Sequence, residues 1–385
     1  MKIVFFSNFF NHHQAALSDA LWRKTNGEFL FVETCPMPQE RKLLGYSEIQ
    51  REYTRNINGN ESLVSQKLQE ADLVIAGSAP ESLIRQRIKT GKLLFRYSER
   101  PLKKGLEPAK YLPRLIRWHW RNPFWKPIYL LCASAYAAGD YAKFGLFRKR
   151  TYQWGYFPET KEYTNFDEIM ASKSELEILW CGRFLDWKHP EMVLQAAQRL
   201  KAEGYSFRVK LIGRGQQEER LHRMVREYRL EDCAAILGAI AAEQVRSHME
   251  QAGIFLCTSD RQEGWGAVLN EAMNSGCAVI AGHAIGAVPF LISNGENGIV
   301  YESENAEMLY EKLKTLLEHP EEQKRLGAAA YETIGNLWNA ETAADRVIQL
   351  AESILAGENS PNLFPSGPCS RAAVINESWK RSNAE

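Results

Sequence analysis

The sequence predicts an α/β protein of two lobes, each a doubly wound parallel sheet covered by helices. Three observations indicate this fold class. The length of 385 residues suits two domains better than one. Short apolar runs alternate with amphipathic helical patterns along the chain, and the alternation breaks off and restarts across residues 155–175. Such alternation is typical of βαβ units, whose strands pair in parallel and whose helices cover both faces of the sheet.

The first lobe is expected over residues 1–158. Apolar runs that are short and rich in branched and aromatic residues predict its buried strands, and 3.6-residue periodicity predicts its helices. The expected strands span residues 3–7, 29–33, 73–77 and 93–97, and the expected helices span 14–24 and 61–70. The polar, Pro-containing stretch 155–175 is interpreted as the linker to the second lobe.

The second lobe is expected over residues 174–337, with the same strand and helix patterns. Its expected strands span 176–181, 207–212, 234–237, 253–258, 278–281 and 298–301, and its expected helices span 189–202, 217–229, 243–251, 266–275, 306–318 and 321–334. A further helix is expected over about 339–356. Residues 357–385 are rich in Gly, Pro and Ser, which predicts a flexible tail.

The composition excludes several classes of protein. The chain is 45% apolar and 25% charged, which is typical of a globular protein and not of a disordered or fibrous one. The net charge is +1, so no binding of nucleic acid is expected from bulk charge. Residues 1–160 hold 25 Lys and Arg against 14 Asp and Glu, whereas the remainder holds 23 against 33. This asymmetry indicates two lobes with different partners.

The seven cysteines are scattered and odd in number, with no C-x-x-C pair. A disulfide framework or zinc site is therefore not expected, and the cysteine usage favours a reducing compartment. No signal peptide or run of about 20 apolar residues is recognisable. We therefore expect a cytoplasmic protein, either free or peripheral on the inner face of a membrane.

The most informative motif lies between an expected strand and an expected helix, around residues 258–272. Gly264 and Gly266 would let the backbone approach a ligand closely, because they lack a Cβ. The N–H groups of Gly266, Ala267 and Val268 would lie at the positive end of the helix. This arrangement predicts a phosphate site.

Charged residues around this motif complete a candidate site. Glu263 and Glu271 can each accept hydrogen bonds from sugar or ribose hydroxyls. Arg183 and Lys188 follow the first strand of the same lobe and can neutralise a diphosphate. The alternatives are an ordinary loop acid for Glu263 and an exposed helix residue for Glu271. For Arg183 and Lys188 the alternative is a basic loop paired with Asp186.

Two further strand-end loops are candidates for contact with a base or its ribose. They contain Gly213 and Arg214 in one loop and Ile240 in the other. In open α/β sheets, ligands bind beyond the carboxyl ends of the strands, which is where these residues are expected.

Taken together, these motifs resemble a known family. The matching stretches are Gly182-Arg183 with Lys188, Leu211-Ile212-Gly213-Arg214-Gly215, Glu263-Gly264-Trp265-Gly266 with Glu271-Ala272-Met273, Gly276-Cys277-Ala278-Val279-Ile280, and Asn294-Gly295-Glu296-Asn297-Gly298. They look like the C-terminal lobe of the family-four retaining glycosyltransferases (glycosyl transferases group 1) of bacterial surface-polysaccharide type, which have the GT-B fold, with two Rossmann-like lobes and a cleft between them.

The resemblance implies transfer of a sugar from a nucleotide-sugar to a hydroxyl of a saccharide or lipid-linked saccharide, with retention of configuration. It implies neither a metal ion nor a cofactor. It also implies that the helix over about 339–356 crosses back onto the first lobe, which would make the lobes discontinuous in sequence. By position, Arg183 and Lys188 would bind the diphosphate and Glu271 the ribose. Glu263 would bind the donor sugar. The amides near Gly266, Ala267 and Val268 would hold the phosphate oxygens, and Gly264 and Trp265 would also belong to the donor site.

The first lobe departs from the family pattern. The stretch Ser7–Gln14 contains no glycine, and Ser98 and Glu99 stand where many members have a histidine. We hypothesise that His13 and Glu99 contribute to the acceptor or donor-sugar pocket. The alternative for His13 is a polar residue that caps a helix.

Residues 100–150 are strongly basic, with twelve Lys and Arg among which Tyr111, Trp118, Trp120, Phe124 and Trp125 are interleaved. Such a mixture suits the interface of an anionic membrane, where a lipid-linked acceptor would be presented. The alternatives are attraction of nucleic acid and a solvated loop region with buried aromatic residues.

Two rival functions share the expected fold. One is a different enzyme, a nucleotide-sugar epimerase or a glycosyl phosphorylase. The other is a non-catalytic module that binds a nucleotide-sugar without turnover. The nucleotide, the sugar and the acceptor stay open at this point.

Overall fold

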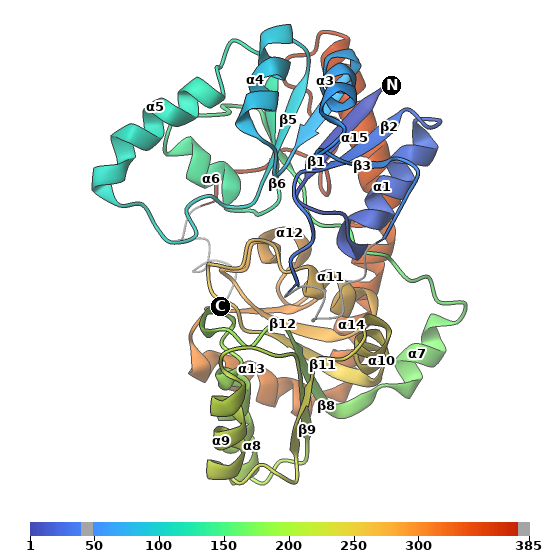
Figure 1. Ribbon diagram of the computed structural model, residues 1–385. Helices are drawn as coiled ribbons and strands as arrows, with labels where there is room; N and C mark the ends of the chain where they lie inside the picture. Colours follow the sequence, from blue (N-terminus) through green and yellow to red (C-terminus); the bar gives the residue numbers. More distant parts are fainter. Residues whose placement is uncertain (40–48, 376–385) are drawn as a thin grey trace. The chain divides into compact units, whose positions relative to one another are not determined.

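The computed structural model describes residues 1–39 and 49–375 of the chain. It divides into two compact lobes (Figure 1). The first lobe comprises Met1–Glu159 together with the segment that begins at Trp338, and the second lobe comprises Thr160–Leu337. Both lobes are parallel sheets flanked by helices, which confirms the predicted fold class. The first lobe is discontinuous in sequence because the chain returns to it at Trp338.

The first lobe is built on a seven-stranded sheet of order β3-β2-β1-β4-β5-β6-β7, in which neighbouring strands are parallel. The strands are β1 (Ile3–Ser7), β2 (Phe29–Glu33), β3 (Thr54–Asn56), β4 (Leu73–Ala76), β5 (Leu94–Ser98), β6 (Ile128–Cys132) and β7 (Thr151–Gln153). The four strands predicted here are present within a residue or two. Three others, β3, β6 and β7, were not predicted as strands.

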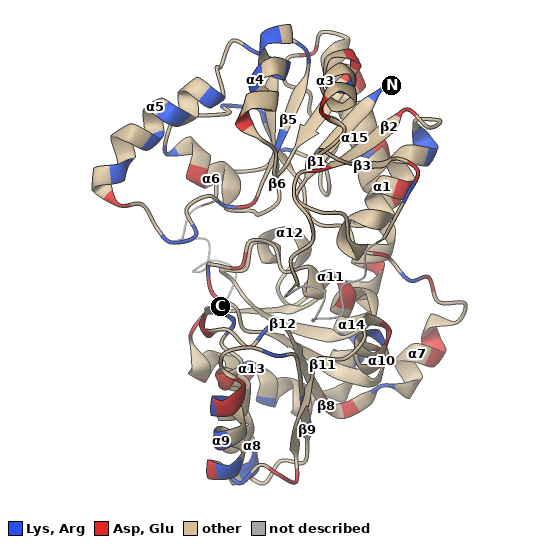
Figure 2. Ribbon diagram, viewed as in Figure 1, with Lys and Arg blue, Asp and Glu red and all other residues tan. Residues whose placement is uncertain are grey.

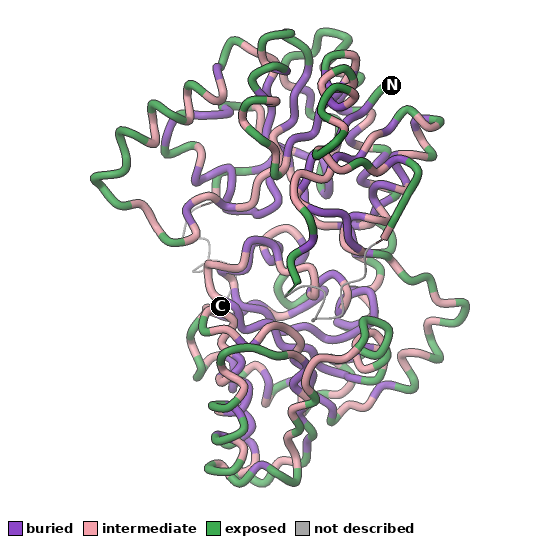
Figure 3. The backbone as a smooth tube through the Cα atoms, viewed as in Figure 1, coloured by how far each residue is buried: buried purple, intermediate pink, exposed green. Residues whose placement is uncertain are grey.

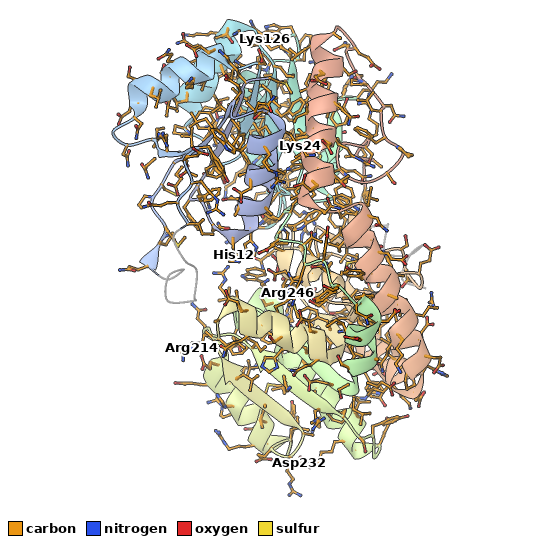
Figure 4. The ribbon with its side chains drawn as sticks, turned by 90° about the vertical axis from the view of Figure 1, so that its right-hand side faces the viewer. His12, Lys24, Lys126, Arg214, Asp232 and Arg246 are labelled. Atoms are coloured by element: carbon orange, nitrogen blue, oxygen red, sulfur yellow. The ribbon has the colours of Figure 1, made fainter. Side chains whose placement is uncertain are left out.

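Helices cover both faces of this sheet (Figure 1). They are α1 (His12–Lys24), α3 (Glu61–Glu70), α4 (Glu81–Thr90), α5 (Tyr111–Arg121), α6 (Ala137–Ala142) and α15 (Ala340–Leu355). Helix α15 packs along α1, although more than 300 residues separate them in sequence (Figure 4). The Lys24 ammonium at the end of α1 lies 2.8 Å from the Asp345 carboxylate of α15.

The second lobe has a six-stranded parallel sheet of order β10-β9-β8-β11-β12-β13. Its strands are β8 (Ser174–Cys181), β9 (Arg208–Ile212), β10 (Ala234–Gly238), β11 (Ala252–Cys257), β12 (Ala278–Gly282) and β13 (Ile299–Tyr301). Its helices are α7 (Phe166–Ser172), α8 (Glu191–Ala202), α9 (Glu218–Glu227), α10 (Ala242–Gln251), α11 (Ala267–Asn274), α12 (Val288–Leu291), α13 (Ala306–Glu318) and α14 (Pro320–Asn336). Helix α7 lies inside the stretch that was interpreted as a linker.

Strands β1, β4, β6, β11 and β12 are buried along their whole length, as the continuous apolar runs predict for sheets covered on both faces (Figure 3). Because all strands of a lobe are parallel, their carboxyl ends meet at one edge of its sheet. In the second lobe this edge carries the loops that follow β8, β9, β10 and β11. The candidate residues of the second lobe are therefore gathered at one edge.

The expectation of a flexible tail over 357–385 is wrong for residues 357–375, which pack onto the first lobe. The backbone of Cys369 and Ser370 is hydrogen-bonded to Gln153 of β7 at 2.8 Å, and Arg371 forms an antiparallel bridge with Tyr152. Cys369 is buried, and the Tyr152 hydroxyl donates to the Pro361 carbonyl at 3.0 Å. The segment is ordered because it continues the sheet at its open edge. Residues 376–385 lie outside the described part of the chain.

Among the described residues, no helix combines the length and the apolar character that crossing a lipid bilayer requires.

Candidate functional site

The turn between β11 and α11 is shaped by Gly266, the residue at which α11 begins. Gly266 has a φ of +94°, in the left-handed region, and no side chain caps the helix. A Cβ at this position would lie 3.1 Å from Cγ2 of Ile285 and 3.4 Å from Cγ of Glu263. The local fold therefore requires glycine. The first turn of α11, which includes Ala267 and Val268, presents the positive end of a helix dipole without a side-chain partner.

A charged pair joins this turn to the loop after β8. The Lys188 ammonium forms an ion pair with the Glu263 carboxylate, and each side chain is only 13% exposed. The Ser259 hydroxyl donates to the same carboxylate oxygen at 3.2 Å. The Thr258 hydroxyl donates to the Lys188 carbonyl at 2.6 Å, which ties the two loops together. Because water is largely excluded from the pair, its electrostatic interactions are stronger than those of an exposed pair.

Glu271 lies in the middle of α11 and faces the same strand ends. The Cys181 thiol at the end of β8 has a pKa of about 12, and burial of the thiol is the main cause of this increase. The charge of Glu271 raises the pKa further, whereas the charge of Lys188 lowers it. Both charges therefore act at the end of β8. Burial also raises the pKa of Glu271 itself. The structure thus brings Lys188, Glu263 and Glu271 to the ends of two neighbouring strands.

Arg246 of α10 holds the far end of α11 and was not predicted. Its guanidinium donates to the side chains of Asn274 at 2.9 Å and Ser275 at 3.2 Å, and to the Glu271 carbonyl at 3.3 Å. Its positive charge lowers the pKa of Glu271 and so opposes the effect of burial. Arg246 therefore positions Glu271 and favours its ionised form. Neither its position inside a helix nor its charge distinguishes it in the sequence.

His189, the residue after Lys188, is a second residue that sequence reasoning missed. It has a left-handed φ of +47°. Its Nδ1 lies 3.1 Å from Glu191, and its Nε2 lies 3.7 Å from Asp260 and 3.5 Å from Glu304.

The carboxylates of Asp260 and Glu191, which face the ring nitrogens, raise the pKa of His189 to about 10. The imidazole is therefore a cation at neutral pH. Since Asp260 begins the turn that contains Glu263, the charged ring positions the glycine-rich turn. Its position directly after Lys188 is the one feature of the sequence that could have marked His189 as a candidate site residue.

The remaining predicted residues of this lobe lie on the loops beyond β8, β9 and β10. Arg183 lies two residues beyond β8 and is partly exposed. Gly213 has a φ of +147°, and a Cβ there would lie 1.8 Å from the Gly182 carbonyl, so its role is close approach of two backbones. Arg214 is exposed, at the end of this lobe opposite to Asp232 (Figure 4). Ile240 is partly exposed before α10.

The prediction that Trp265 contacts a donor is wrong for its side chain. The indole is fully buried, and its Nε1 donates to Oδ1 of Asn270 at 2.8 Å. Its backbone carbonyl accepts the Ala287 N–H at 3.1 Å. Trp265 therefore anchors the turn in the core of the lobe, while Gly264 beside it is also buried.

His13 lies in the first turn of α1, which follows β1, and Glu99 lies in the loop that follows β5. Strand β4 lies between β1 and β5 in the sheet. The N–H of His13 donates to Oδ1 of Asn11 at 2.9 Å. The Glu99 carboxylate accepts the Tyr156 hydroxyl at 2.8 Å and forms an ion pair with Lys103. Both residues thus belong to the loop edge of their sheet, but each is held by its own neighbours.

A cavity of about 140 Å³ opens at the ends of β4 and β5 in the first lobe. Its lining includes Arg96, Ser98, Arg121, Asn122 and Tyr141. Of these five residues, only Ser98 was named as a candidate site residue from the sequence, because it follows a predicted strand. The others were not expected at the end of a strand, where candidate residues were sought. The cavity offers several hydrogen-bond donors to a polar ligand.

Comparisons with known proteins agree with this geometry. Residues 163–333 match the family model described as glycosyl transferases group 1. The putative colanic acid biosynthesis glycosyltransferase WcaL of Salmonella typhimurium is 29% identical over 150 residues, which is 38% of this chain and 37% of that protein. The amylovoran biosynthesis glycosyltransferase AmsK of Erwinia amylovora is 29% identical over 144 residues, 36% of this chain and 35% of that protein. The matches thus span little more than a third of these relatives.

Solved structures show the same fold over nearly the whole chain. The crystal structure of Anabaena HepE in complex with UDP has a TM-score of 0.70 and 16% identity, and the match covers 92% of this chain and 100% of HepE. The sucrose-phosphate synthase of Thermosynechococcus elongatus has a TM-score of 0.65 and 15% identity, with coverage of 93% and 100%. The chain therefore has the GT-B fold, and its residues 163–333 are similar to the glycosyl transferases group 1 family.

Proposed function

We propose that the protein is a retaining glycosyltransferase that moves a sugar from a nucleotide-sugar to a hydroxyl of a saccharide or lipid-linked saccharide. The observation that carries this proposal is the uncapped start of α11 beside the Lys188–Glu263 pair. A helix N-terminus and a partly buried cation together favour a diphosphate. HepE binds UDP in its crystal structure, and the curated relatives include polysaccharide glycosyltransferases, which supports the same class of donor.

Each charged group would have a distinct role in this reaction. Lys188 and Arg183, with the first turn of α11, would stabilise the negative charge that develops on the departing nucleotide. Glu271 would accept hydrogen bonds from ribose hydroxyls. Glu263, held by Lys188 and Ser259, would orient the donor sugar. Positioning of donor and acceptor would supply much of the rate.

These protein cations would do the work that a metal ion does elsewhere, so the proposed transfer is independent of metal. Activity should therefore be unchanged by a chelator. We also propose that the enzyme acts in the cytoplasm, where nucleotide-sugars are made.

A panel of UDP-, GDP- and ADP-sugars tests the function, with release of the free nucleotide as the readout. We expect one donor class to release nucleotide faster when a saccharide acceptor is added. NMR of the product should show the donor's anomeric configuration. Epimerisation of a donor without any acceptor would favour the epimerase instead, and nucleotide binding without turnover would favour a non-catalytic module.

A further inference from the structure

Helix α5 (Tyr111–Arg121) of the first lobe has no buried residue. Three of its apolar side chains are largely exposed: Leu112 is 60% exposed, Ile116 64% and Trp120 58%. Phe124 and Trp125, in the turn that follows, are even more exposed. Large apolar side chains gathered in this way mark an interaction site, because single exposed ones are ordinary.

The helix is nevertheless fixed to the lobe by one face. The ring of Tyr111 stacks on Phe144 with 5.0 Å between centroids, and Trp118 packs on Phe144 at 4.7 Å and on Tyr141 at 4.9 Å. At the other end Arg96 of β5 donates to the Arg121 carbonyl at 3.0 Å. The exposed apolar side chains are therefore held outward by a docked helix.

The helical spacing arranges side chains of α5 in two stripes. Leu112, Ile116 and Trp120 follow one another at intervals of four and form an exposed apolar stripe. Arg114, Arg117 and Arg121 form a basic stripe on another side; Arg117 is exposed, whereas Arg114 and Arg121 are partly buried. Figure 2 shows the blue segments along α5. Helix α5 contains no acidic residue. Apolar and basic stripes side by side are typical of helices that lie in a membrane interface.

We propose that this surface, α5 with Phe124 and Trp125, docks on an anionic lipid bilayer. The apolar stripe would enter the boundary between headgroups and acyl chains, while the arginines would contact lipid phosphates. A second copy of the chain fits less well, because a two-fold contact through this face would bring the two basic stripes together. A nucleic acid would match the arginines but would leave the apolar stripe in water.

Docking on a membrane would also indicate the class of acceptor. Trp118, Arg121 and Asn122, at the end of α5, line the cavity of the first lobe. A saccharide carried on a membrane lipid would reach the cavity from the surface on which α5 lies. This last step rests on the proposed function, whereas the docking itself does not.

Co-sedimentation with vesicles tests the docking, using the full chain without donor. We compare vesicles of phosphatidylcholine alone with vesicles of phosphatidylcholine mixed with phosphatidylglycerol. We expect binding to the mixed vesicles that weakens as salt is raised. Replacing the apolar stripe (Leu112→Ser, Ile116→Ser and Trp120→Ser together) should lower the partition coefficient at least about tenfold, and Arg117→Gln alone should lower it about fivefold.

The matched control carries Leu176→Ser and Leu355→Ser, which remove exposed leucines elsewhere, and it should bind like the wild type. Absence of binding to the mixed vesicles at low salt would overturn the proposal. So would equal binding to both kinds of vesicle, or a triple variant that loses self-association in sedimentation velocity while vesicle binding is unchanged. Nucleotide binding measured by calorimetry does not involve α5, so failure of docking and failure of the proposed function are distinguishable.

Discussion

Helices α1 and α11 both follow a buried strand of their lobe, yet they begin in different ways. Helix α1 is capped by Asn11, whose Oδ1 accepts the His13 N–H at 2.9 Å. The Phe10 N–H just before it donates to Glu33 at 2.8 Å, and the ring of Phe10 is buried. Helix α11 begins at Gly266, and no side chain caps it.

The difference shows how one strand–helix unit serves two purposes. At α1 the chain's own side chains satisfy backbone amides, which stabilises the lobe without a ligand. At α11 the glycine-rich turn leaves the helix start without a side-chain cap, which suits the proposed diphosphate, and the nearby Lys188 adds a positive charge. The two helix starts therefore predict different consequences of substitution: loss of ligand binding at α11, whatever the effect on stability, and loss of stability alone at α1.

The largest effect is expected from Lys188→Ala, which removes the cation beside α11. A donor diphosphate would lose a charge-assisted contact, and Glu263 would lose its partner. We expect kcat/KM to fall about 10²- to 10³-fold, as for removal of one electrostatic contact to a transition state. Steady-state kinetics with the donor found in the panel measures this change.

The control is Lys201→Ala. Lys201 is a lysine of the same lobe that pairs with the exposed Asp232, so its loss should leave kcat/KM within about twofold. Equal kinetics for wild type and Lys188→Ala would remove the Lys188–Glu263 pair from the site.

Gly266→Ala should weaken both the fold and the ligand site. The new Cβ would meet Ile285 at 3.1 Å on a backbone with positive φ, which costs about 2 kcal/mol in the free energy of unfolding. Nucleotide affinity should fall about tenfold as the turn shifts. Gly295→Ala is the matched control, since Gly295 also has a positive φ but a Cβ there would meet nothing within 4 Å. Urea unfolding measures the stability of both variants, and calorimetry measures their nucleotide affinity. Equal losses of stability and affinity in the two variants would contradict a special role for the α11 turn.

His189→Gln should remove the ion pair between the charged His189 ring and Asp260, and the resulting loss of stability should depend on pH. The folded pKa of His189 is about 10, above the ordinary 6.5. Its stabilising contribution is therefore complete below pH 6.5 and declines as the pH rises toward 10. We expect wild type to exceed the variant by about 1.5 kcal/mol at pH 6 and by much less at pH 10.

Denaturant unfolding at several pH values measures this difference, with His222→Gln on the exposed side of α9 as control. If the difference in free energy of unfolding between wild type and variant stays constant from about pH 6 to pH 10, the charged His189 ring does not stabilise the fold through Asp260.

The smallest effect is expected from Asn11→Ala, which removes the cap of α1. The free energy of unfolding should fall by about 1 kcal/mol because the His13 N–H loses its acceptor. Nucleotide affinity should stay the same, in contrast to Gly266→Ala. A change in affinity with unchanged stability would reverse the roles assigned to the two helix starts.

The sequence predicted those parts of the molecule that local patterns determine. The strands β1, β8 and β11 follow from apolar runs, and the α11 turn follows from Gly264, Gly266 and the flanking glutamates, since close backbone approach needs glycine at definite positions. Contacts between distant segments could not be predicted in this way. Residues 357–375 lack periodicity, and they are held by pairing with β7 and by contacts with other parts of the first lobe.

The same reason explains the missed and misassigned side chains. Arg246 and His189 act through partners far away in sequence. Trp265 belongs to the motif, but its indole is used for packing with Asn270. Helix α5 escaped prediction because Pro113 and an arginine-rich pattern obscure its period, although the basic and aromatic residues did indicate a surface of special character.

Isothermal titration calorimetry of UDP, GDP, ADP and their sugar derivatives tests the central claim most directly. We predict that one nucleotide diphosphate binds in a one-to-one complex, and that Lys188→Ala and Glu271→Gln each weaken it about tenfold or more while Lys201→Ala does not. Absence of binding by every compound, or affinity indifferent to Lys188 and Glu271, would contradict this claim.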